Sequence, residues 1–270
     1  MCGLAGIFAY KRGAQPICEG ELLRMREAMR TRGPDGSGFW ISGDRLVGLA
    51  HRRLAIIETT AAGAQPMSTS DGGLRIVYNG EIYNYRELRR ALQANGYRFT
   101  TQSDTEVLLH LYREYGHGMV RHLRGMYAFA VWDAGKRGLF LARDPFGIKP
   151  MYYADNGDTL RVASQVKALL AGGSVDNSPE PAGHVGFFLW GYVPDPYTFY
   201  KGIRALPAGT SLWIDAGGQG VPQPFFNLRE TLILAEERAR SVAAGKVGNQ
   251  LREALLDTCL LYTSPSPRDS

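Results

Sequence analysis

The sequence has few cysteines, no long apolar run and no strong excess of one charge, and each absence excludes a class of protein. Its three cysteines, Cys2, Cys18 and Cys259, form no CxxC pair and no even-numbered set, which argues against a zinc ribbon or a disulfide scaffold. No apolar stretch approaches the ~18 residues that a membrane-spanning helix needs. The N-terminus lacks the charged and apolar segments of a signal peptide. We therefore expect a cytoplasmic protein.

The charge balance gives no sign of a nucleic-acid partner. The chain has 31 Lys and Arg against 26 Asp and Glu, a net charge of +5. Two basic segments, 24–32 and 86–90, carry apolar residues at helical spacing between their arginines, which is typical of helices with a solvated basic face. No RNA-binding or zinc-finger pattern accompanies them. We expect neither nucleic acid nor a membrane as a partner.

Short runs rich in Val, Ile, Phe, Tyr and Trp, bounded by Gly, Asp and Pro, are present instead, and they predict β-strands. These runs are 4–9, 38–41, 46–49, 74–78, 126–132, 139–142, 151–154 and 160–163. Many strands with few long helices between them favour antiparallel sheets with packed helices, an α+β layered domain.

Two helices have recognisable start signals. Asn84 followed by Glu87 resembles a capping box, and Gly96 is expected to close that helix. Ser103 followed by Glu106 matches the same pattern and predicts a helix over Asp104–Tyr115.

Cys2 directly follows the initiator methionine. A small residue at this position permits removal of Met1, which leaves Cys2 with a free α-amino group. A thiol of pKa about 8.5 is mostly protonated at neutral pH. An α-amino group of pKa about 7.7–8.0 in the same residue can act as its general base. Cys2 is thus a candidate nucleophile that needs no histidine.

Cys2 lies in the first of a series of motifs with a characteristic order and spacing. They are MCGLAGIF at 1–8, RGPDG at 32–36, HRRLAI at 51–56, YNGEIYNY at 78–85, SDTE at 103–106 and RDPFGIKPMYY at 143–153. In this order the chain resembles the glutaminase domain of glutamine-hydrolysing asparagine synthases, which are class II glutamine amidotransferases. The resemblance implies the fold of N-terminal-nucleophile hydrolases, a four-layer αββα sandwich of antiparallel sheets.

The resemblance covers residues 2–218, which we expect to be the glutaminase domain, followed by a linker at 219–227. Residues 228–259 resemble the first helical part of an asparagine synthetase domain. The pyrophosphate-binding Ser-Gly-Gly-x-Asp-Ser run of that domain is absent, so we expect a chain truncated before the ATP site. Residues 260–270 are predicted to be a non-native tail, with a genuine disordered tail as the alternative.

Three residues are candidates for the chemistry. The resemblance implies hydrolysis of the glutamine side-chain amide to glutamate and ammonia through a thioester on Cys2. It also implies that Asn79 and Gly80 form the oxyanion hole, since a side-chain amide and an unobstructed backbone N–H can both donate to a developing negative charge. The alternative is that Asn79 and Gly80 form a turn after a strand.

The substrate of such an enzyme is a free amino acid, so both of its charges must be bound. Arg53 suits the α-carboxylate, because a planar guanidinium can pair with both oxygens. Asp104 suits the α-ammonium, Glu81 shares that task, and the backbone of Leu54 and Ile56 lines the site. The alternatives are a surface charge at Arg53 and an acid favoured by the helix dipole at Asp104.

The expected partners are L-glutamine and the missing synthetase domain, and a homodimer is a further candidate. No metal site is expected, because the histidines lack ligand spacing. No cofactor is expected for this chain, whereas ATP and Mg²⁺ are expected for the full-length enzyme. Two other functions stay open: a class II domain that serves a different ammonia acceptor, and a non-catalytic domain that binds amino acids.

Overall fold

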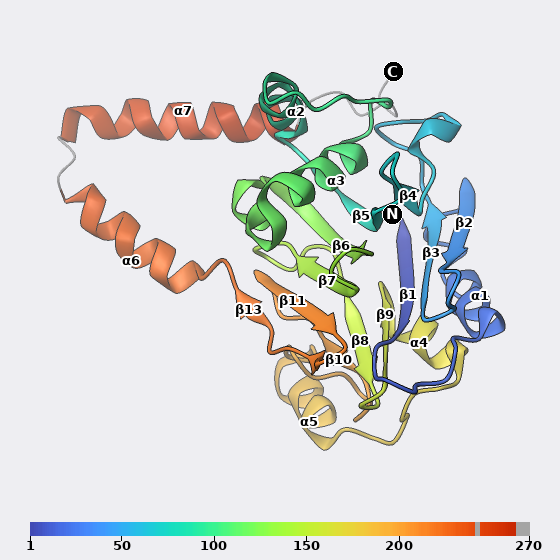
Figure 1. The fold of residues 1–270 in the computed structure, drawn as a ribbon. Coiled ribbons are helices and arrows are strands. Elements are labelled where there is room, and N and C mark those ends of the chain that lie inside the picture. The colour runs from blue at the N-terminus through green and yellow to red at the C-terminus, as the bar shows by residue number, and fades with distance from the viewer. Residues whose placement is uncertain (241–243, 263–270) are drawn as a thin grey trace. The chain divides into compact units, whose positions relative to one another are not determined.

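A computed structural model describes residues 1–240 and 244–262 of the chain (Figure 1). The chain divides into two compact units, Met1–Phe225 and Phe226–Ser270. Within the described residues, no helix has the length and apolar character needed to cross a membrane.

The first unit contains two antiparallel sheets. One has the strand order β10-β8-β9-β1-β3-β2. Its strands are β1 (Gly3–Ala9), β2 (Gly36–Ile41), β3 (Val47–Arg53), β8 (Tyr152–Asp155), β9 (Thr159–Ala163) and β10 (Arg204–Ala205). The other has the order β12-β11-β7-β6-β5-β4, with β13 paired to β11. Its strands are β4 (Met67–Ser68), β5 (Leu74–Ile82), β6 (Gly125–Asp133), β7 (Gly138–Arg143), β11 (Thr210–Asp215), β12 (Gly218–Gln219) and β13 (Gln223–Pro224).

Helices cover the outer face of each sheet. Helices α1 (Glu19–Glu27) and α4 (Val166–Gly172) share an apolar cluster with the first sheet. Helices α2 (Tyr85–Ala94) and α3 (Asp104–Tyr115) share another with the second sheet. A third cluster lies between the sheets. This confirms the predicted αββα layers. Helix α5 (Pro181–Trp190) follows α4 in the chain.

The helix starts were predicted at the right residues but with partly wrong hydrogen bonds. Asn84 precedes α2 without capping it, because its amide accepts from Arg124 N at 3.0 Å and donates to His122 O at 2.9 Å. Ser103 does cap α3, accepting from the Thr105 backbone N–H. The Glu106 carboxylate binds backbone N–H groups at residues 100 and 101. The Asn84 capping box is therefore wrong, because longer-range partners take that side chain.

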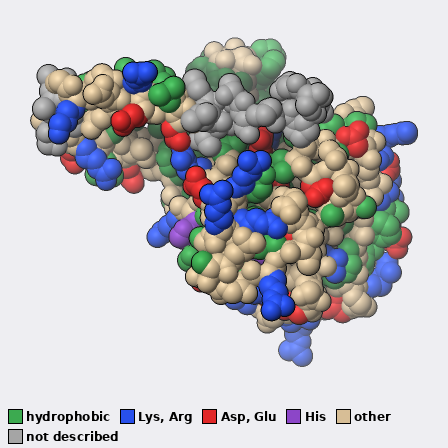
Figure 2. All heavy atoms as spheres, turned by 90° about the horizontal axis from the view of Figure 1, so that it is seen from above, with side chains coloured by type: hydrophobic (Ala, Val, Ile, Leu, Met, Phe, Trp, Pro, Cys, Tyr) green, Lys and Arg blue, Asp and Glu red, His purple; other side chains and the backbone are tan. Residues whose placement is uncertain are grey.

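The basic segment 86–90 has partners within the fold. The Arg89 guanidinium lies 4.5 Å from the centre of the Phe99 ring and donates to the Thr101 carbonyl at 2.7 Å. On the face drawn in Figure 2, basic side chains are interspersed with acidic and hydrophobic ones. Arg89 thus contributes to packing as well as to surface charge.

The second unit consists of α6 (Leu228–Ala239) and α7 (Ala244–Tyr262). Asn227 caps α6 by accepting from the backbone N–H of Arg229 and Glu230. The side chains described in both helices are exposed. Of the predicted non-native tail, residues 263–270 lie outside the described part of the chain.

Candidate active site

Strand alternation directs two of the predicted residues into the space between the sheets. On β1, Leu4 belongs to the cluster between the sheets, and Cys2, directly before the strand, lies on the same side of the chain if the alternation of side chains extends to it. On β5, Val77 belongs to the same cluster while Tyr78 faces the helices. Asn79 therefore points the same way as Val77. The thiol and the amide enter the site from facing sheets.

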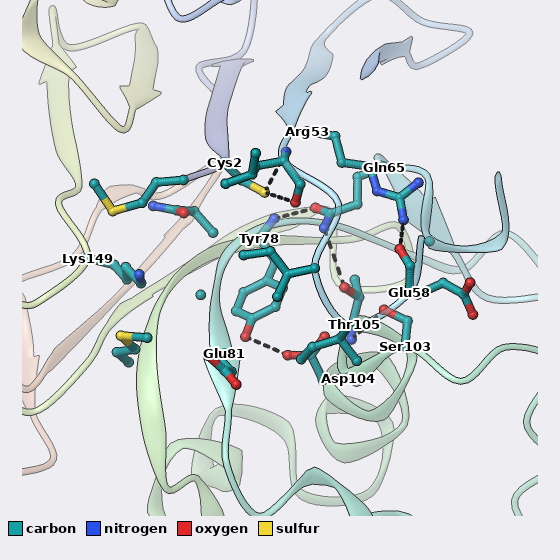
Figure 3. A pocket seen from close by; sticks show the side chains of 18 residues that line it. Cys2, Arg53, Glu58, Gln65, Tyr78, Glu81, Ser103, Asp104, Thr105 and Lys149 are labelled. Carbon is teal, nitrogen blue, oxygen red and sulfur yellow. Dashed lines mark hydrogen bonds between the residues drawn. The ribbon is translucent and has the colours of Figure 1, made fainter. Parts of the chain in front are cut away.

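Every residue predicted for the site lines one pocket (Figure 3). The predicted members are Cys2, Arg53, Leu54, Ile56, Asn79, Gly80, Glu81 and Asp104. The other members, which were not predicted as site residues, are Met1, Ile57, Glu58, Gly63, Gln65, Tyr78, Ser103, Thr105, Met126 and Lys149. In this view Tyr78 lies between Cys2 on one side and Asp104 on the other.

The Cys2 thiol is held by the backbone that follows β3. Its Sγ accepts from the Leu54 N–H at 3.3 Å and donates to the Leu54 carbonyl at 3.4 Å. Arg32 Nε donates to the Cys2 carbonyl at 3.0 Å, which fixes the start of β1. Burial raises the pKa of the Cys2 thiol, against the opposing effects of the Leu54 hydrogen bond and the Arg53 charge. The thiol is therefore neutral at neutral pH and needs a base to react.

Asn79 and Gly80 lie inside β5, opposite Ala128 and Tyr127 of β6, so the turn alternative is wrong. The Asn79 side chain is 1% exposed, and among the described residues its Nδ2 has no hydrogen-bond partner. A buried unpaired donor costs roughly 1–3 kcal/mol of stability. It is a group that a bound oxyanion would satisfy.

Gly80 occupies a place where no side chain fits. A Cβ at this position would overlap the Met126 carbonyl oxygen and the Tyr127 Cα atom on the neighbouring strand. The close approach of β5 and β6 therefore requires glycine here. It also leaves the backbone beside Asn79 open to the pocket.

Asp104 occupies the first turn of α3 and is buried. Its Oδ2 accepts from the Tyr78 hydroxyl at 2.8 Å and from the Ile82 N–H at 3.2 Å. Burial raises the pKa of Asp104 to about 6, and these two hydrogen bonds oppose the rise. At neutral pH the carboxyl is mostly ionised, so a buried negative charge faces the pocket.

Arg53 ends β3 and organises the loop that follows. Its guanidinium donates to the Thr60 carbonyl at 2.7 Å and to the Glu58 carbonyl. The loop thus folds around the arginine, and Leu54 and Ile56 line the pocket beside it. Arg53 is half-buried and lines the pocket while its guanidinium makes these two contacts.

Gln65 and Lys149 are functional candidates that motif reasoning missed. Gln65 Oε1 accepts from the Tyr78 N–H at 2.6 Å, and its Nε2 donates to Thr105 Oγ1 at 3.4 Å. Lys149 is buried in the pocket wall, and burial lowers the pKa of its ammonium against the effect of Glu81. Lys149 lies in the 143–153 motif, so a signal was present. For Gln65 the sequence offered none.

Taken together, these groups can bind a zwitterion and attack an amide. A buried carboxylate and a guanidinium provide opposite charges, a thiol provides a nucleophile, and an unpaired amide provides a donor for an oxyanion. Within the described residues, no group of three or more His, Cys, Asp or Glu side chains could hold a metal ion.

Known proteins share this sequence pattern and this fold. A family model described as a glutamine amidotransferase domain matches residues 1–226. Asparagine synthetase [glutamine-hydrolyzing] 1 of Bacillus subtilis is 36% identical over 259 residues, which is 96% of this chain and 39% of that protein. Amidase chry2 of Gibberella zeae is 37% identical over 237 residues, 84% of this chain and 34% of that protein. The chain thus spans well under half the length of these relatives.

A solved structure shows a similar fold. Glutamine phosphoribosylpyrophosphate amidotransferase from B. subtilis, complexed with ADP and GMP, superposes with a TM-score of 0.59 at 22% identity. The match covers 83% of this chain and 49% of the other. It supports the N-terminal-nucleophile hydrolase fold that the sequence motifs predict.

Proposed function

The chain belongs to the glutamine amidotransferase family, and from this premise we propose that Cys2 hydrolyses the side-chain amide of L-glutamine to glutamate and ammonia. The observation that carries the proposal is the thiol held by Leu54 in the same pocket as the unpaired Asn79 amide. This combination provides a nucleophile and a donor for the charge that its attack creates.

In the proposed mechanism, removal of Met1 frees the α-amino group of Cys2. This amine takes the thiol proton, and the thiolate attacks the side-chain carbonyl carbon of glutamine. Asn79 Nδ2 and the Gly80 N–H donate to the resulting oxyanion. The ammonium of Cys2 returns its proton to the leaving nitrogen, which departs as ammonia. Water, deprotonated by the same amine, then cleaves the thioester and releases glutamate.

We assign recognition of the amino acid to the other groups of the pocket. Arg53 pairs with the α-carboxylate, and Asp104, assisted by Glu81, pairs with the α-ammonium. The backbone at Leu54 and Ile56 forms the wall beside the substrate. The support for this assignment is that these charged groups line the pocket that contains Cys2.

We further propose that the ammonia serves asparagine synthesis, as the name of the B. subtilis relative suggests. In the full-length protein a synthetase domain would use ATP and Mg²⁺ to activate aspartate. We assign that chemistry to the synthetase domain. One relative is named an amidase, so the acceptor needs its own test. A reactive thiol suits the reducing cytoplasm.

The domain boundary is part of this proposal. We assign the glutaminase domain to residues 2–218 and the first helical part of a synthetase domain to residues 228–259. The segment between them, expected to be a linker, contains β13, and the Phe225 N–H donates to the Gly209 carbonyl at 2.9 Å. We therefore expect deletion of residues 227–270 to preserve glutamine hydrolysis. Deletion of 219–270 removes β13 and Phe225, so it should lower the unfolding temperature.

The decisive experiment measures ammonia and glutamate released from L-glutamine by the purified chain. Mass spectrometry first establishes that Met1 has been removed. Equal amounts of the two products are expected, with no release by the Cys2→Ala variant. Retained Met1 together with glutamine binding but no hydrolysis would favour the non-catalytic alternative. Asparagine formation from aspartate and ATP by this chain alone would contradict the proposal that a separate synthetase domain activates aspartate.

A further inference from the structure

Tyr78 has a hydrogen bond at each of its polar atoms, and each bond reaches a different part of the fold. Its backbone N–H donates to Gln65 Oε1 at 2.6 Å, and its carbonyl pairs with His51 Nε2 at 2.9 Å. Its hydroxyl donates to Asp104 Oδ2 at 2.8 Å. The side chain is buried, and it lies between Cys2 and Asp104 in Figure 3.

The backbone bonds fix the strand next to Asn79. His51 is fully buried, and burial lowers its pKa to about 4, so the ring is neutral at neutral pH. Since a carbonyl oxygen only accepts, the proton of the neutral ring must be on Nε2. His51 on β3 thereby joins one sheet to Tyr78 on β5 of the other. The hydroxyl of Tyr78 is then presented to α3 from a fixed position.

The hydroxyl of Tyr78 is a permanent donor. Burial and the Asp104 charge raise the pKa of Tyr78 well above its usual range. The Asp104 carboxyl, by contrast, has a pKa of about 6 because burial penalises its charge, and the Tyr78 hydroxyl opposes that effect. Other charged groups act here as well. Glu81 on β5 raises the Asp104 pKa, and the Cys2 thiol and Arg53 line the same pocket, as does Lys149.

We propose that Tyr78 is a positioning residue for glutamine recognition, whose hydroxyl aligns the Asp104 carboxylate with the substrate α-ammonium and favours its ionised form. This inference rests on the proposed function, in which Asp104 binds that ammonium. Without the hydroxyl, the buried carboxylate would lose the shorter of the two hydrogen bonds that its Oδ2 accepts and keep the one from the Ile82 N–H. Protonation would become easier, and a protonated carboxyl cannot pair with a cation.

The test is Tyr78→Phe, which removes one oxygen atom and leaves the ring in the apolar cluster. A hydrogen bond to a charged group typically contributes enough to change binding about 10-fold or more. We expect the KM for glutamine to rise about 10-fold at pH 6.5 and less at pH 8, where Asp104 ionises in either protein. We expect kcat to change less than about two-fold. The ratio of kcat/KM between the unmodified chain and the variant should therefore be larger at pH 6.5 than at pH 8, because the Cys2 amine affects both proteins equally.

Tyr112→Phe is a matched control. The Tyr112 hydroxyl donates to Asp133 Oδ2 at 3.2 Å in another buried tyrosine–aspartate pair, and neither residue lines the pocket. This variant should lose stability without a change in KM or in the pH profile. An equal shift of the profile in both variants would mean that the effect is structural. An unchanged profile in Tyr78→Phe would overturn the proposal directly.

Binding measured without turnover separates this inference from the proposed function. In a Cys2→Ala background, calorimetry gives the Kd of L-glutamine at pH 6.5 and pH 8, with and without Tyr78→Phe. A loss of affinity that is larger at pH 6.5 supports the role of Tyr78, even if the unmodified chain releases no ammonia. Hydrolysis by the unmodified chain together with a Kd insensitive to Tyr78→Phe overturns the role of Tyr78 and leaves the proposed function intact.

Discussion

Asn79 and Asp104 are both buried polar residues of one pocket, yet their hydrogen-bonding states are opposite. The Asp104 carboxylate, at the start of α3, already accepts from two donors. The Asn79 amide, on β5, has an Nδ2 without a partner among the described residues. A group that is satisfied beforehand is preorganised for a ligand charge that is always present. A donor left unsatisfied is suited to a charge that exists only in the transition state.

Substitution of Cys2, which removes the reacting sulfur atom, should have the largest effect on activity. Cys2→Ala should abolish ammonia release, and Cys2→Ser should be nearly as inactive because a hydroxyl is a far poorer nucleophile at neutral pH. The fold should persist, since little buried volume is lost. Circular dichroism and glutamine binding serve as controls. Substantial ammonia release by either variant would show that another residue is the nucleophile.

Asn79→Ala tests the role of the amide donor that has no hydrogen-bond partner in the described structure. It removes a donor needed mainly in the transition state, so kcat should fall by about 10²–10³ with KM little changed. Because the buried Nδ2 makes no hydrogen bond in the described structure, the substitution removes no stabilising hydrogen bond, and the free energy of unfolding should not decrease. Steady-state kinetics and denaturant unfolding measure the two effects. A rise in KM at constant kcat would place Asn79 in ground-state binding instead.

Asp104→Asn tests the role of the carboxylate charge, which is already hydrogen-bonded in the free protein. The substitution removes the negative charge and retains an oxygen that can accept from the Tyr78 hydroxyl. We expect KM for glutamine to rise about 10-fold or more, with a smaller loss in kcat. The same steady-state assay at pH 8 checks this. If instead kcat collapses while KM holds, the contrast between the two residues is lost.

Substitution of His51 should have the smallest effect on turnover. Its main effect should be on the pH dependence of the free energy of unfolding. Burial lowers the pKa of His51 to about 4, below the ordinary value of about 6.5. The unfolded chain therefore binds this proton more tightly, and the free energy of unfolding should fall as pH drops from about 6.5 to 4, by about 3 kcal/mol in total. His51→Gln, which can still donate to the Tyr78 carbonyl, should flatten that dependence. Urea unfolding at pH 7 and pH 4.5 provides the measurement.

Local patterns were sufficient to predict the strands with clear apolar runs and the helix over Asp104–Tyr115. They missed β11, whose residues include polar side chains and whose main partner is β7, far away in the chain. They also misassigned the Asn84 side chain, because its partners lie some forty residues further along. A hydrogen bond between distant segments leaves no periodic signal in either segment.

The site shows the same limit. The resemblance to asparagine synthases predicted Cys2, Asn79 and Asp104 as site residues, and all three line one pocket. It did not predict Gln65 or His51, which reach Tyr78 only when the chain is folded. Tyr78 itself stood inside a motif, yet nothing in the sequence says that a tyrosine hydroxyl will meet a carboxylate on a helix. Residues that act through other residues need the three-dimensional structure.

Met1 lies in the wall of the pocket, directly before the residue whose amine is proposed as the base. Any residue ahead of Cys2 turns that amine into an amide nitrogen, which cannot accept a proton. A fusion partner joined to the N-terminus would therefore block the Cys2 amine and keep the chain inactive. For the same reason an affinity tag belongs at the C-terminus. A protease that cuts directly before Cys2 would free the amine and restore activity. Such a blocked chain would release ammonia from glutamine only after the protease is added.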